Sequence, residues 1–373
     1  MDLQAFRALL TDEGRSLLAA LQEADAGGEM ESAAAAALRQ GRPAALVAAA
    51  EEQVRLRGLA AAKFGEFAPR MFLTPDLVEL SSHLAVSDYK LDRVLDVMGV
   101  VLIDAMCLGS SADGLVLSWS HHTTAVDADP LTVEIAAANA PVVNTGLFFP
   151  ECEEPARFDS QGEAVFIDLV RRPGPDGGHD PESYGPPLSW ALERVRTTGT
   201  GWIRLVPDLP PGALPGLGRA DEAEWISHAG VVQELVLWFG LHLEPAPVTA
   251  RKATVLPSRA SLTARGLPDP SVRPPGRYVY VPDPAVVHAG LVAEVAEDIA
   301  GGRLDGGGTL LTSDELRHTP FATAYEVIGV PAHAPVPEES VEFVVAAADG
   351  PMTLSTVPVP VPVPVPARFP QAP

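Results

Sequence analysis

The chain has 373 residues, 47% of them apolar, which is enough for a substantial core and predicts two or three domains. Its 49 acidic residues against 26 Lys and Arg give a net charge of −23. This excludes a basic nucleic-acid-binding coat and limits any contact with a polyanion to a local surface, because phosphate affinity comes from Lys and Arg. Two cysteines exclude a disulfide scaffold and a cysteine-based metal cluster.

The N-terminus opens with an acidic residue and carries no basic region before an apolar stretch, which argues against a signal peptide. We find no run of about 18 apolar residues that could form a membrane-spanning helix. We therefore expect a cytoplasmic protein without a membrane partner.

Residues 1–90 have the pattern of a helical region. Leucines recur at helical spacing between positions 9 and 21, and Thr11 and Asp12 can cap a helix that starts near Glu13. We expect a second helix around 33–37 and a third over 46–62. The charged residues of the third helix are interpreted as a solvated face: Glu51, Glu52, Arg55 and Arg57.

From residue 91 short apolar runs alternate with helical stretches. The runs are rich in β-branched residues and mostly continuous, as in strands that are covered on both faces of a parallel α/β sheet. They occupy 100–106, 123–129, 164–169 and 201–206. Three of them end at or near Asp104, Asp127 and Asp168, which could converge in the crevice beyond the carboxyl ends of the strands.

The chain becomes Pro-rich from about residue 246. A helix over 285–300 and strand-like runs at 308–312, 324–330 and 341–347 predict a second, smaller α/β domain. Five Val-Pro repeats over 357–366 lack every second backbone donor, so they predict an extended, disordered tail outside any strand ladder. The expected divisions are 1–90, 91–245, 246–355 and 356–373.

The turn after the first strand has the spacing of a nucleotide-binding turn. Gly109 precedes Asp127 by 18 residues, close to the roughly 20 expected before an acid that accepts the ribose hydroxyls. Such turns normally contain several glycines, and here only one remains, so a ligand-free βαβ unit would look similar. Asp129 and Pro130 are expected to cap and start the following helix.

Other candidate residues have mainly structural interpretations. Adjacent strand residues point to opposite faces, so His121 and His122 do not make a metal pair, and we expect no metal. The tryptophans at 190, 225 and 238 and both cysteines are expected in the core. A serine hydrolase is a weaker alternative, because the segment around Ser111 lacks the last glycine of a nucleophile elbow.

Several segments together resemble one family. They include 56–79, VDADPLTVEIAAAN (126–139), VFIDLVRR (165–172), 180–190, 222–240, 251–257, 278–296 and 319–327. The chain resembles bacterial class I S-adenosylmethionine-dependent methyltransferases with a THUMP-like C-terminal domain, which are similar to trimethylguanosine synthase type RNA methyltransferases. The resemblance implies a Rossmann-like sheet between an N-terminal helical region and a small α/β domain.

The resemblance also implies roles for individual residues. Asp104, Cys107, Gly109 and Asp127 would hold S-adenosylmethionine, with Asp104 anchoring the turn and Asp127 on the ribose. Asp168 would lie beside the methyl acceptor and accept a hydrogen bond or proton from it, while Arg171 and Arg172 could hold a phosphate. Salt bridges to surface acids are the alternative for the two arginines. RNA or another nucleobase-containing acceptor would be bound weakly and locally.

The chain also departs from the family pattern. DAMCLGSSAD (104–113) stands where DLGCGIGGD is usual, so Met106 and Leu108 replace glycines, and Met106 is expected to crowd the cofactor. Leu169 replaces a proline, Arg204 and Asp208 stand in a KLAPG-type segment, and the basic C-terminal segment is missing. The alternative to an active methyltransferase is therefore a catalytically degenerate, methyltransferase-like binding or scaffold protein.

Overall fold

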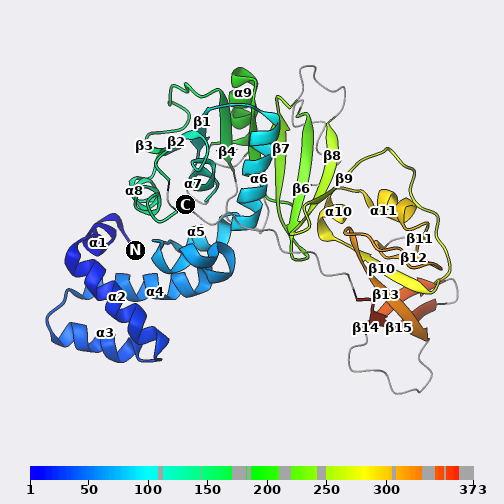
Figure 1. Cartoon of the computed structure of the whole chain (residues 1–373), viewed down its shortest axis with the longest axis horizontal. Helices are drawn as coiled ribbons and strands as arrows, with labels where there is room; N and C mark the ends of the chain where they lie inside the picture. The colour runs from blue at the N-terminus through cyan, green and yellow to red at the C-terminus, as the bar shows by residue number, and fades with distance from the viewer. Residues whose placement is uncertain are drawn as a thin grey trace. The chain divides into compact units, whose positions relative to one another are not determined.

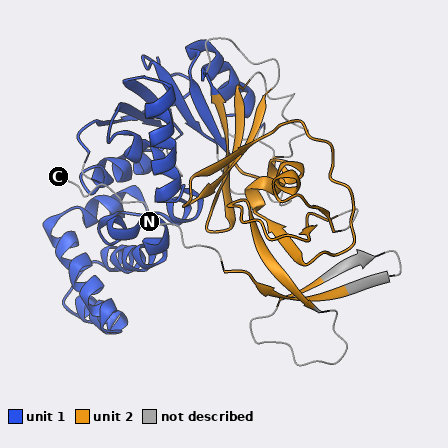
Figure 2. Cartoon of the chain, turned by 45° about the vertical axis from the view of Figure 1, so that its right-hand side comes forward, with its two compact units in different colours: residues 1–205, 239–241 blue, residues 206–238, 242–373 orange. Residues whose placement is uncertain are grey.

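The computed structural model describes residues 1–107, 112–143, 145–169, 182, 186–209, 220–241, 249–304, 308–329, 341–347 and 350–360. The chain divides into two compact units (Figure 2). The first unit contains Met1–Leu205 and Phe239–Leu241, and the second contains Val206–Trp238 and His242–Pro373. Each unit is described by itself.

The first unit begins with a series of helices (Figure 1). They are α1 (Leu3–Leu9), α2 (Asp12–Ala26), α3 (Met30–Arg39), α4 (Ala44–Phe64), the 3₁₀ helix η1 (Gly65–Arg70), α5 (Pro75–Leu80) and α6 (Leu84–Val97). The three helices predicted in residues 1–90 are confirmed as α2, α3 and α4. The Thr11 side chain caps α2 by accepting a hydrogen bond from the Gly14 amide.

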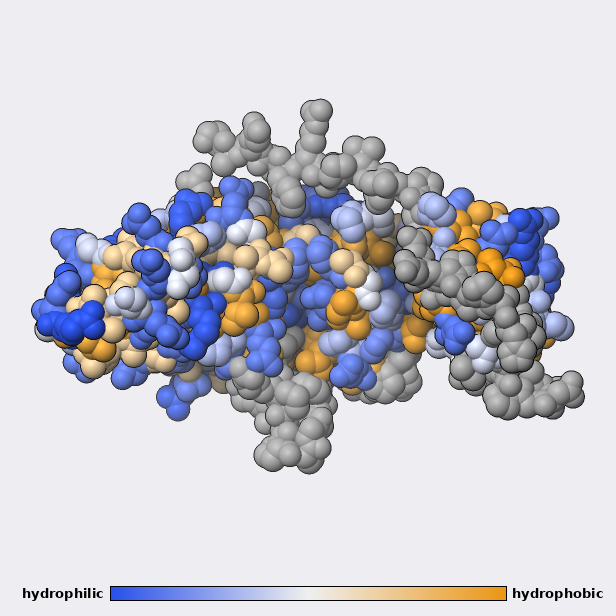
Figure 3. Space-filling model, turned by 90° about the horizontal axis from the view of Figure 1, so that it is seen from below, coloured by the Kyte–Doolittle hydropathy of each residue, from blue (hydrophilic) through white to orange (hydrophobic). Residues whose placement is uncertain are grey.

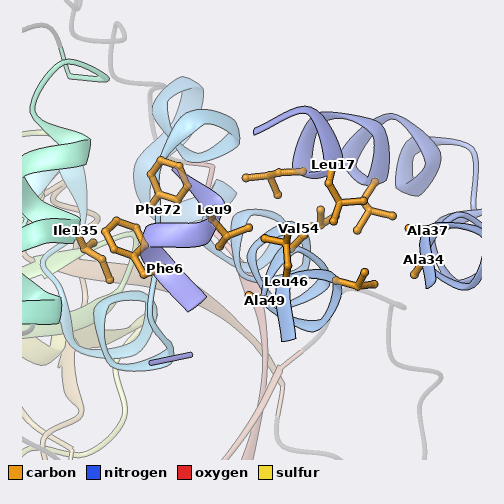
Figure 4. Packing of buried hydrophobic residues seen from close by; sticks show 14 residues of the cluster. Phe6, Leu9, Leu17, Ala34, Ala37, Leu46, Ala49, Val54, Phe72 and Ile135 are labelled. Carbon is orange, nitrogen blue, oxygen red and sulfur yellow. The ribbon is translucent and has the colours of Figure 1, made fainter. Parts of the chain in front are cut away.

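Helices α1 to α4 share one apolar core with Phe72 and with the helix that follows the second strand (Figure 4). The rings of Phe6 and Phe72 meet edge to face, with their centroids 5.4 Å apart. Ile135 belongs to the same cluster. The N-terminal helices are therefore packed into the first unit.

The interpretation of the α4 charges as a solvated face was wrong for Arg57. Its side chain is 9% exposed and donates to the carbonyl oxygen of Met71 at 2.8 Å and to Gln22 Oε1 at 2.6 Å. Burial lowers the pKa of Arg57 to about 10. Periodicity could not reveal this role, because the partners of Arg57 come from other elements.

The four strands predicted between residues 100 and 206 are confirmed. The elements are β1 (Leu102–Met106), α7 (Asp113–Leu117), β2 (His122–Asp127), α8 (Pro130–Asn139), β3 (Phe148–Cys152), β4 (Ala164–Asp168), α9 (Leu188–Thr198) and β5 (Gly201–Leu205). The strands run parallel in the order β3-β2-β1-β4-β5. Every residue of β4 and β5 is buried, which explains why these runs are mostly apolar.

The second unit contains strands of two sheets. In one, β6 (Glu222–His228) lies between β7 (Val231–Phe239) and β8 (Ala250–Leu256), and β9 (Ala260–Thr263) follows β8. The other has the order β11-β12-β10-β13-β15-β14. Its strands are β10 (Tyr278–Pro282), β11 (Gly302–Arg303), β12 (Leu311–Ser313), β13 (Ala322–Gly329), β14 (Val341–Ala347) and β15 (Gly350–Pro358).

Two predictions for the C-terminal part differ from the structure. The single helix over 285–300 is two helices, α10 (Pro284–His288) and α11 (Val292–Asp298), because Gly290 between them has a φ of +67°. Strand β15 includes the first Val-Pro repeat, with Val357 opposite Glu326. Pro358 is the last strand residue, but the Val359 amide after it still donates to the Ala324 carbonyl oxygen at 2.9 Å, so the pairing with β13 extends past this proline. Residues 361–373 lie outside the described part.

Some core predictions also need correction. Trp225 and Trp238 are fully buried, as predicted, whereas Trp190 is only half-buried, with the Arg194 guanidinium 5.7 Å from its ring centroid. Cys107 is buried. Cys152 is exposed because it ends β3, the outermost of the five parallel strands. Strand position, rather than residue type, decides its exposure.

Apolar residues at the surface are mostly single. Figure 3 shows hydrophobic residues scattered among hydrophilic ones on the face that it displays. Exposed examples are Leu38 of α3, Leu59 of α4 and Val231 of β7. Among the helices of the described ranges, none is both long and apolar enough to cross a membrane.

Candidate functional site

Two of the three predicted aspartates lie at the same edge of the parallel sheet. Met106, the last residue of β1, is level with Val126 on one side and with Ile167 on the other. Asp127 and Asp168 each follow by one residue and end β2 and β4. They therefore flank the end of β1, and two strand spacings place their backbones about 10 Å apart.

Asp104 lies away from this edge. It is level with Thr124 and Val165, three residues before the ends of the neighbouring strands. Its Oδ2 accepts hydrogen bonds from Ser160 Oγ at 2.6 Å and from the Gly162 amide at 2.8 Å. The three aspartates therefore do not converge. Asp104 ties the segment before β4 to β1, and its effect on the turn after β1 is at most indirect.

Gly162 allows this tie to form. A Cβ atom at this position would lie 2.8 Å from the Ala164 carbonyl oxygen and 3.0 Å from Asp104 Cγ. Both separations are shorter than an ordinary van der Waals contact. Only glycine brings the backbone this close to the Asp104 carboxylate.

Cys107 makes the sharp turn that follows β1. It has a φ of +65°, a left-handed conformation that glycine adopts more readily than cysteine, and its amide donates to the Val126 carbonyl oxygen at 2.9 Å. Met106, where the family pattern has a glycine, continues β1 with a fully buried side chain. The left-handed backbone conformation is therefore at Cys107, one residue after Met106. Gly109 lies outside the described residues.

Asp168 is part of a buried ion pair. Arg204 Nη1 donates to Asp168 Oδ2 at 3.0 Å, and the two side chains are 3% and 0% exposed. The residues are opposite each other on β4 and β5. Arg204 Nη2 also donates to the carbonyl oxygen of Leu80, the last residue of α5, at 2.7 Å. A buried carboxylate needs such a partner, because desolvation penalises an isolated charge.

A second buried ion pair joins α6 to α7. Lys90 Nζ lies 2.7 Å from Asp113 Oδ2, and both side chains are at most 3% exposed. The same oxygen accepts from Ser82 Oγ at 2.9 Å, while Asp113 Oδ1 accepts from Ser87 Oγ. Burial acts to raise the pKa of Asp113, but the charges of Lys90 and Arg204 and these hydrogen bonds lower it below its ordinary value.

Sequence reasoning missed this four-charge cluster of Lys90, Asp113, Asp168 and Arg204. It noted Asp113 and Arg204 only as departures from a family pattern. Lys90 lies in the segment DYKLDR, whose mixed charges are typical of a solvated helix face. The signal that could have found it is the apolar residue Leu91 beside it, which belongs to the same buried face of α6.

Asp127 and Asp129 shape the loop after β2. Asp127 Oδ1 accepts from the Asp129 amide at 2.9 Å, and Asp129 caps α8 by accepting from the amides of Leu131 and Thr132. The predicted cap is therefore confirmed. Asp127 is only partly exposed. Beside the start of α8 is a cavity of about 270 Å³, whose lining includes Thr74, Asp76 and Asp129.

An extended segment borders this cavity and is held by side-chain amides. Asn139 accepts from the Phe72 amide and donates to the Phe72 carbonyl oxygen, both at 2.8 Å. Gln53 does the same for Leu73, at 2.8 and 2.7 Å. All these groups are buried, so the two amides replace the strand that would otherwise satisfy this backbone.

The other predicted residues do not add to the site. His121 is buried, and burial lowers its pKa, while the exposed His122 stacks on Phe149 with ring centroids 5.8 Å apart. Within the described ranges, no cluster of three His, Cys, Asp or Glu side chains could hold a metal ion. Arg171, Arg172 and Ser111 lie outside these ranges.

Comparisons with known proteins agree with this architecture. A candidate methyltransferase from Porphyromonas gingivalis W83 superposes with a TM-score of 0.66 over 84% of this chain and 90% of that chain, at 17% identity. The chain has the fold of a class I methyltransferase. Residues 2–60 match a family described as a domain of unknown function, DUF8688.

Curated relatives carry a more specific name. Two strains of Mycobacterium tuberculosis each have an uncharacterised S-adenosylmethionine-dependent methyltransferase that is 26% identical to this chain over 283 residues. The alignment covers 74% of this chain and 76% of each relative. The similarity therefore extends well beyond the DUF8688 segment.

Proposed function

We propose that this protein is an S-adenosylmethionine-dependent methyltransferase. The observation that carries the proposal is the placement of Asp127 and Asp168 on either side of β1, at the carboxyl edge of a class I methyltransferase sheet. This edge is where open α/β sheets bind their ligands. The name of the Mycobacterium tuberculosis relatives supports the choice of cofactor.

The residues at this edge fit such a cofactor. Asp127 is partly exposed, and its carboxylate can accept hydrogen bonds from the two hydroxyls of a ribose. Met106 ends β1 with a fully buried side chain. When bound, S-adenosylmethionine supplies a methyl group on a positively charged sulfur.

Asp168 would act on the acceptor side. Its carboxylate, which is paired with Arg204, can accept a hydrogen bond from an amine N–H and so orient the nitrogen. Because Asp168 is completely buried, only an acceptor atom that displaces water from the site can make this hydrogen bond. The acceptor is proposed to be RNA or another nucleobase-containing molecule, as the family resemblance implies, with Arg171 and Arg172 holding a phosphate.

Titration calorimetry with S-adenosylhomocysteine tests the cofactor assignment. We expect Asp127→Ala to weaken binding about tenfold or more, since a ribose would lose its charged acceptor. Asp129→Ala is the matched control, because it removes a neighbouring carboxylate that serves as a helix cap. The control should lose about 1 kcal/mol of stability and bind normally.

Two results would overturn the proposal. One is the absence of S-adenosylmethionine and S-adenosylhomocysteine binding at millimolar concentration, which would support a degenerate binding or scaffold protein. The other is equal binding by Asp127→Ala and Asp129→Ala. Transfer of a labelled methyl group to total RNA tests the acceptor class separately. Samples that contain protein instead of RNA as the acceptor, and samples without RNA, are the controls.

A further inference from the structure

Arg204 is a charged residue inside a strand whose other residues carry no charge. The sequence of β5 is GWIRL, and all five residues are buried. An arginine at such a position loses its hydration, so its charge is tolerated only if partners compensate for the burial. The partners of Arg204 therefore indicate what the residue does.

Two partners hold the Arg204 guanidinium through different nitrogens. Nη1 donates to Asp168 Oδ2 at 3.0 Å, and Nη2 donates to the Leu80 carbonyl oxygen at 2.7 Å. The guanidinium is planar and its N–H groups have a fixed geometry, so these two contacts restrict both its position and its orientation. The Asp168 carboxylate is therefore linked through Arg204 to a backbone carbonyl at the end of α5.

The end of α5 is itself held by a second cation. Lys63 of α4 donates through Nζ to three carbonyl oxygens there, those of Val78 at 2.7 Å, Glu79 at 3.0 Å and Ser81 at 2.8 Å. Together with Arg204 it binds four consecutive carbonyls near a helix C-terminus, where such groups lack intrahelical partners and favour positive charge. The anchor that Arg204 uses is therefore fixed.

Charge compensation and orientation are separable functions of Arg204. A lysine at this position would keep a positive charge beside Asp168. Its ammonium is a point charge on a flexible chain, however, so it cannot reproduce the fork that bridges a carboxylate and a backbone carbonyl in one plane. A substitution by lysine therefore removes the orientation and keeps the charge.

We propose that Arg204 is a positioning residue for methyl transfer. It holds the Asp168 carboxylate in the orientation in which that group accepts a hydrogen bond from the methyl acceptor, and it takes its own position from the end of α5. This role requires no contact between Arg204 and the cofactor or the acceptor. The inference rests on the proposed function.

Transfer of a labelled methyl group from S-adenosylmethionine to total RNA tests the inference, with binding of S-adenosylhomocysteine measured on the same samples. Arg204→Lys should lower kcat about 30-fold or more, since a displacement of about 1 Å at a reacting centre can cost about 100-fold. The KM for S-adenosylmethionine and the dissociation constant of S-adenosylhomocysteine should stay within about twofold of the wild type, because Asp168 acts on the acceptor side.

Arg57→Lys is the matched control. Arg57 is also a buried arginine of the first unit, and it also joins a backbone carbonyl oxygen to a side-chain oxygen, those of Met71 and Gln22. The same substitution there should lower the melting temperature by a comparable amount and leave kcat within about twofold of the wild type.

Two further variants show whether Arg204 acts through its partners. In an Asp168→Asn background, Arg204→Lys should lower the residual rate by less than about twofold, because the effects of residues that act as a unit are not additive. Lys63→Met releases the end of α5 without changing Arg204 and should lower kcat about threefold to tenfold. Lys63 is partly exposed, so this variant decides the question if Arg204→Lys does not fold.

The outcomes separate the inference from the proposed function. Wild-type kcat in Arg204→Lys would overturn the inference, and so would an equal loss of kcat in Arg57→Lys. If the effects of Arg204→Lys and Asp168→Asn multiply in full, Arg204 does not work through Asp168. If Arg204→Lys does not fold, wild-type kcat in Lys63→Met overturns the inference. A wild type that transfers no methyl group to RNA would refute the proposed function and this inference together.

Discussion

The buried pair of Asp168 and Arg204 combines an acceptor-side carboxylate with a structural role. The two side chains form an ion pair in the interior, and Arg204 also donates to the last carbonyl of α5. A simple Asp168→Ala variant would therefore lose stability as well as any catalytic contact. Asp168→Asn is the better choice, because an amide can still accept a hydrogen bond from Arg204.

We expect Arg204→Met to lose about 3–5 kcal/mol in the free energy of unfolding, because the buried Asp168 carboxylate loses the Arg204 charge. The double variant Asp168→Leu with Arg204→Met should recover most of that loss, since both charges of the pair are removed together. Urea unfolding of the wild type and the variants measures both effects. A double variant as unstable as Arg204→Met would contradict the importance of the buried charge.

Asp113 should make stability depend on pH. Its folded-state pKa lies below its unfolded value of about 3.9, so its contribution is complete above that value and is lost as the pH falls through the folded pKa. We expect Asp113→Asn to be less stable at pH 7 and to lose less stability below about pH 4. Urea unfolding between pH 3 and 7 measures the slopes. Equal slopes would show that Asp113 contributes no such linkage.

At the level of elements, the sequence predicted what local patterns determine. The continuous apolar runs identified β1, β2, β4 and β5, and Asp129 with Pro130 identified the start of α8. Contacts between distant elements were not predictable. Within their own helices, Lys90 and Arg57 look like surface charges. Lys90 is buried because it pairs with a residue of α7, and Arg57 is buried because it donates to the segment that follows η1.

The segment that contains Phe72 and Leu73 has a further element-scale consequence. Asn139→Leu should lose about 2 kcal/mol or more, because the buried amide and carbonyl of Phe72 would both lose their partner. Gln53→Met should have a similar effect at Leu73. Thermal unfolding monitored by circular dichroism measures the losses. Wild-type melting temperatures in both variants would contradict this account.

At the scale of the whole molecule, the charge of −23 opposes contact with any polyanion. If the acceptor is RNA, binding must depend on a few local cations, and we expect weak affinity with a shallow salt dependence, of about two or three released counterions. Fluorescence anisotropy of labelled RNA between 50 and 300 mM salt measures the slope. A slope typical of many phosphate contacts, about −6 or steeper, would contradict this prediction.

The different exposure of the two cysteines offers a spectroscopic reporter. Cys152 is exposed and lies opposite Asp127 in the pairing of β3 with β2, whereas Cys107 is buried. A thiol-reactive fluorophore should therefore label Cys152 selectively in the native protein, without substitution of Cys107. Because the dye would be attached one strand away from the proposed ribose-binding carboxylate, its emission could follow ligand arrival in real time.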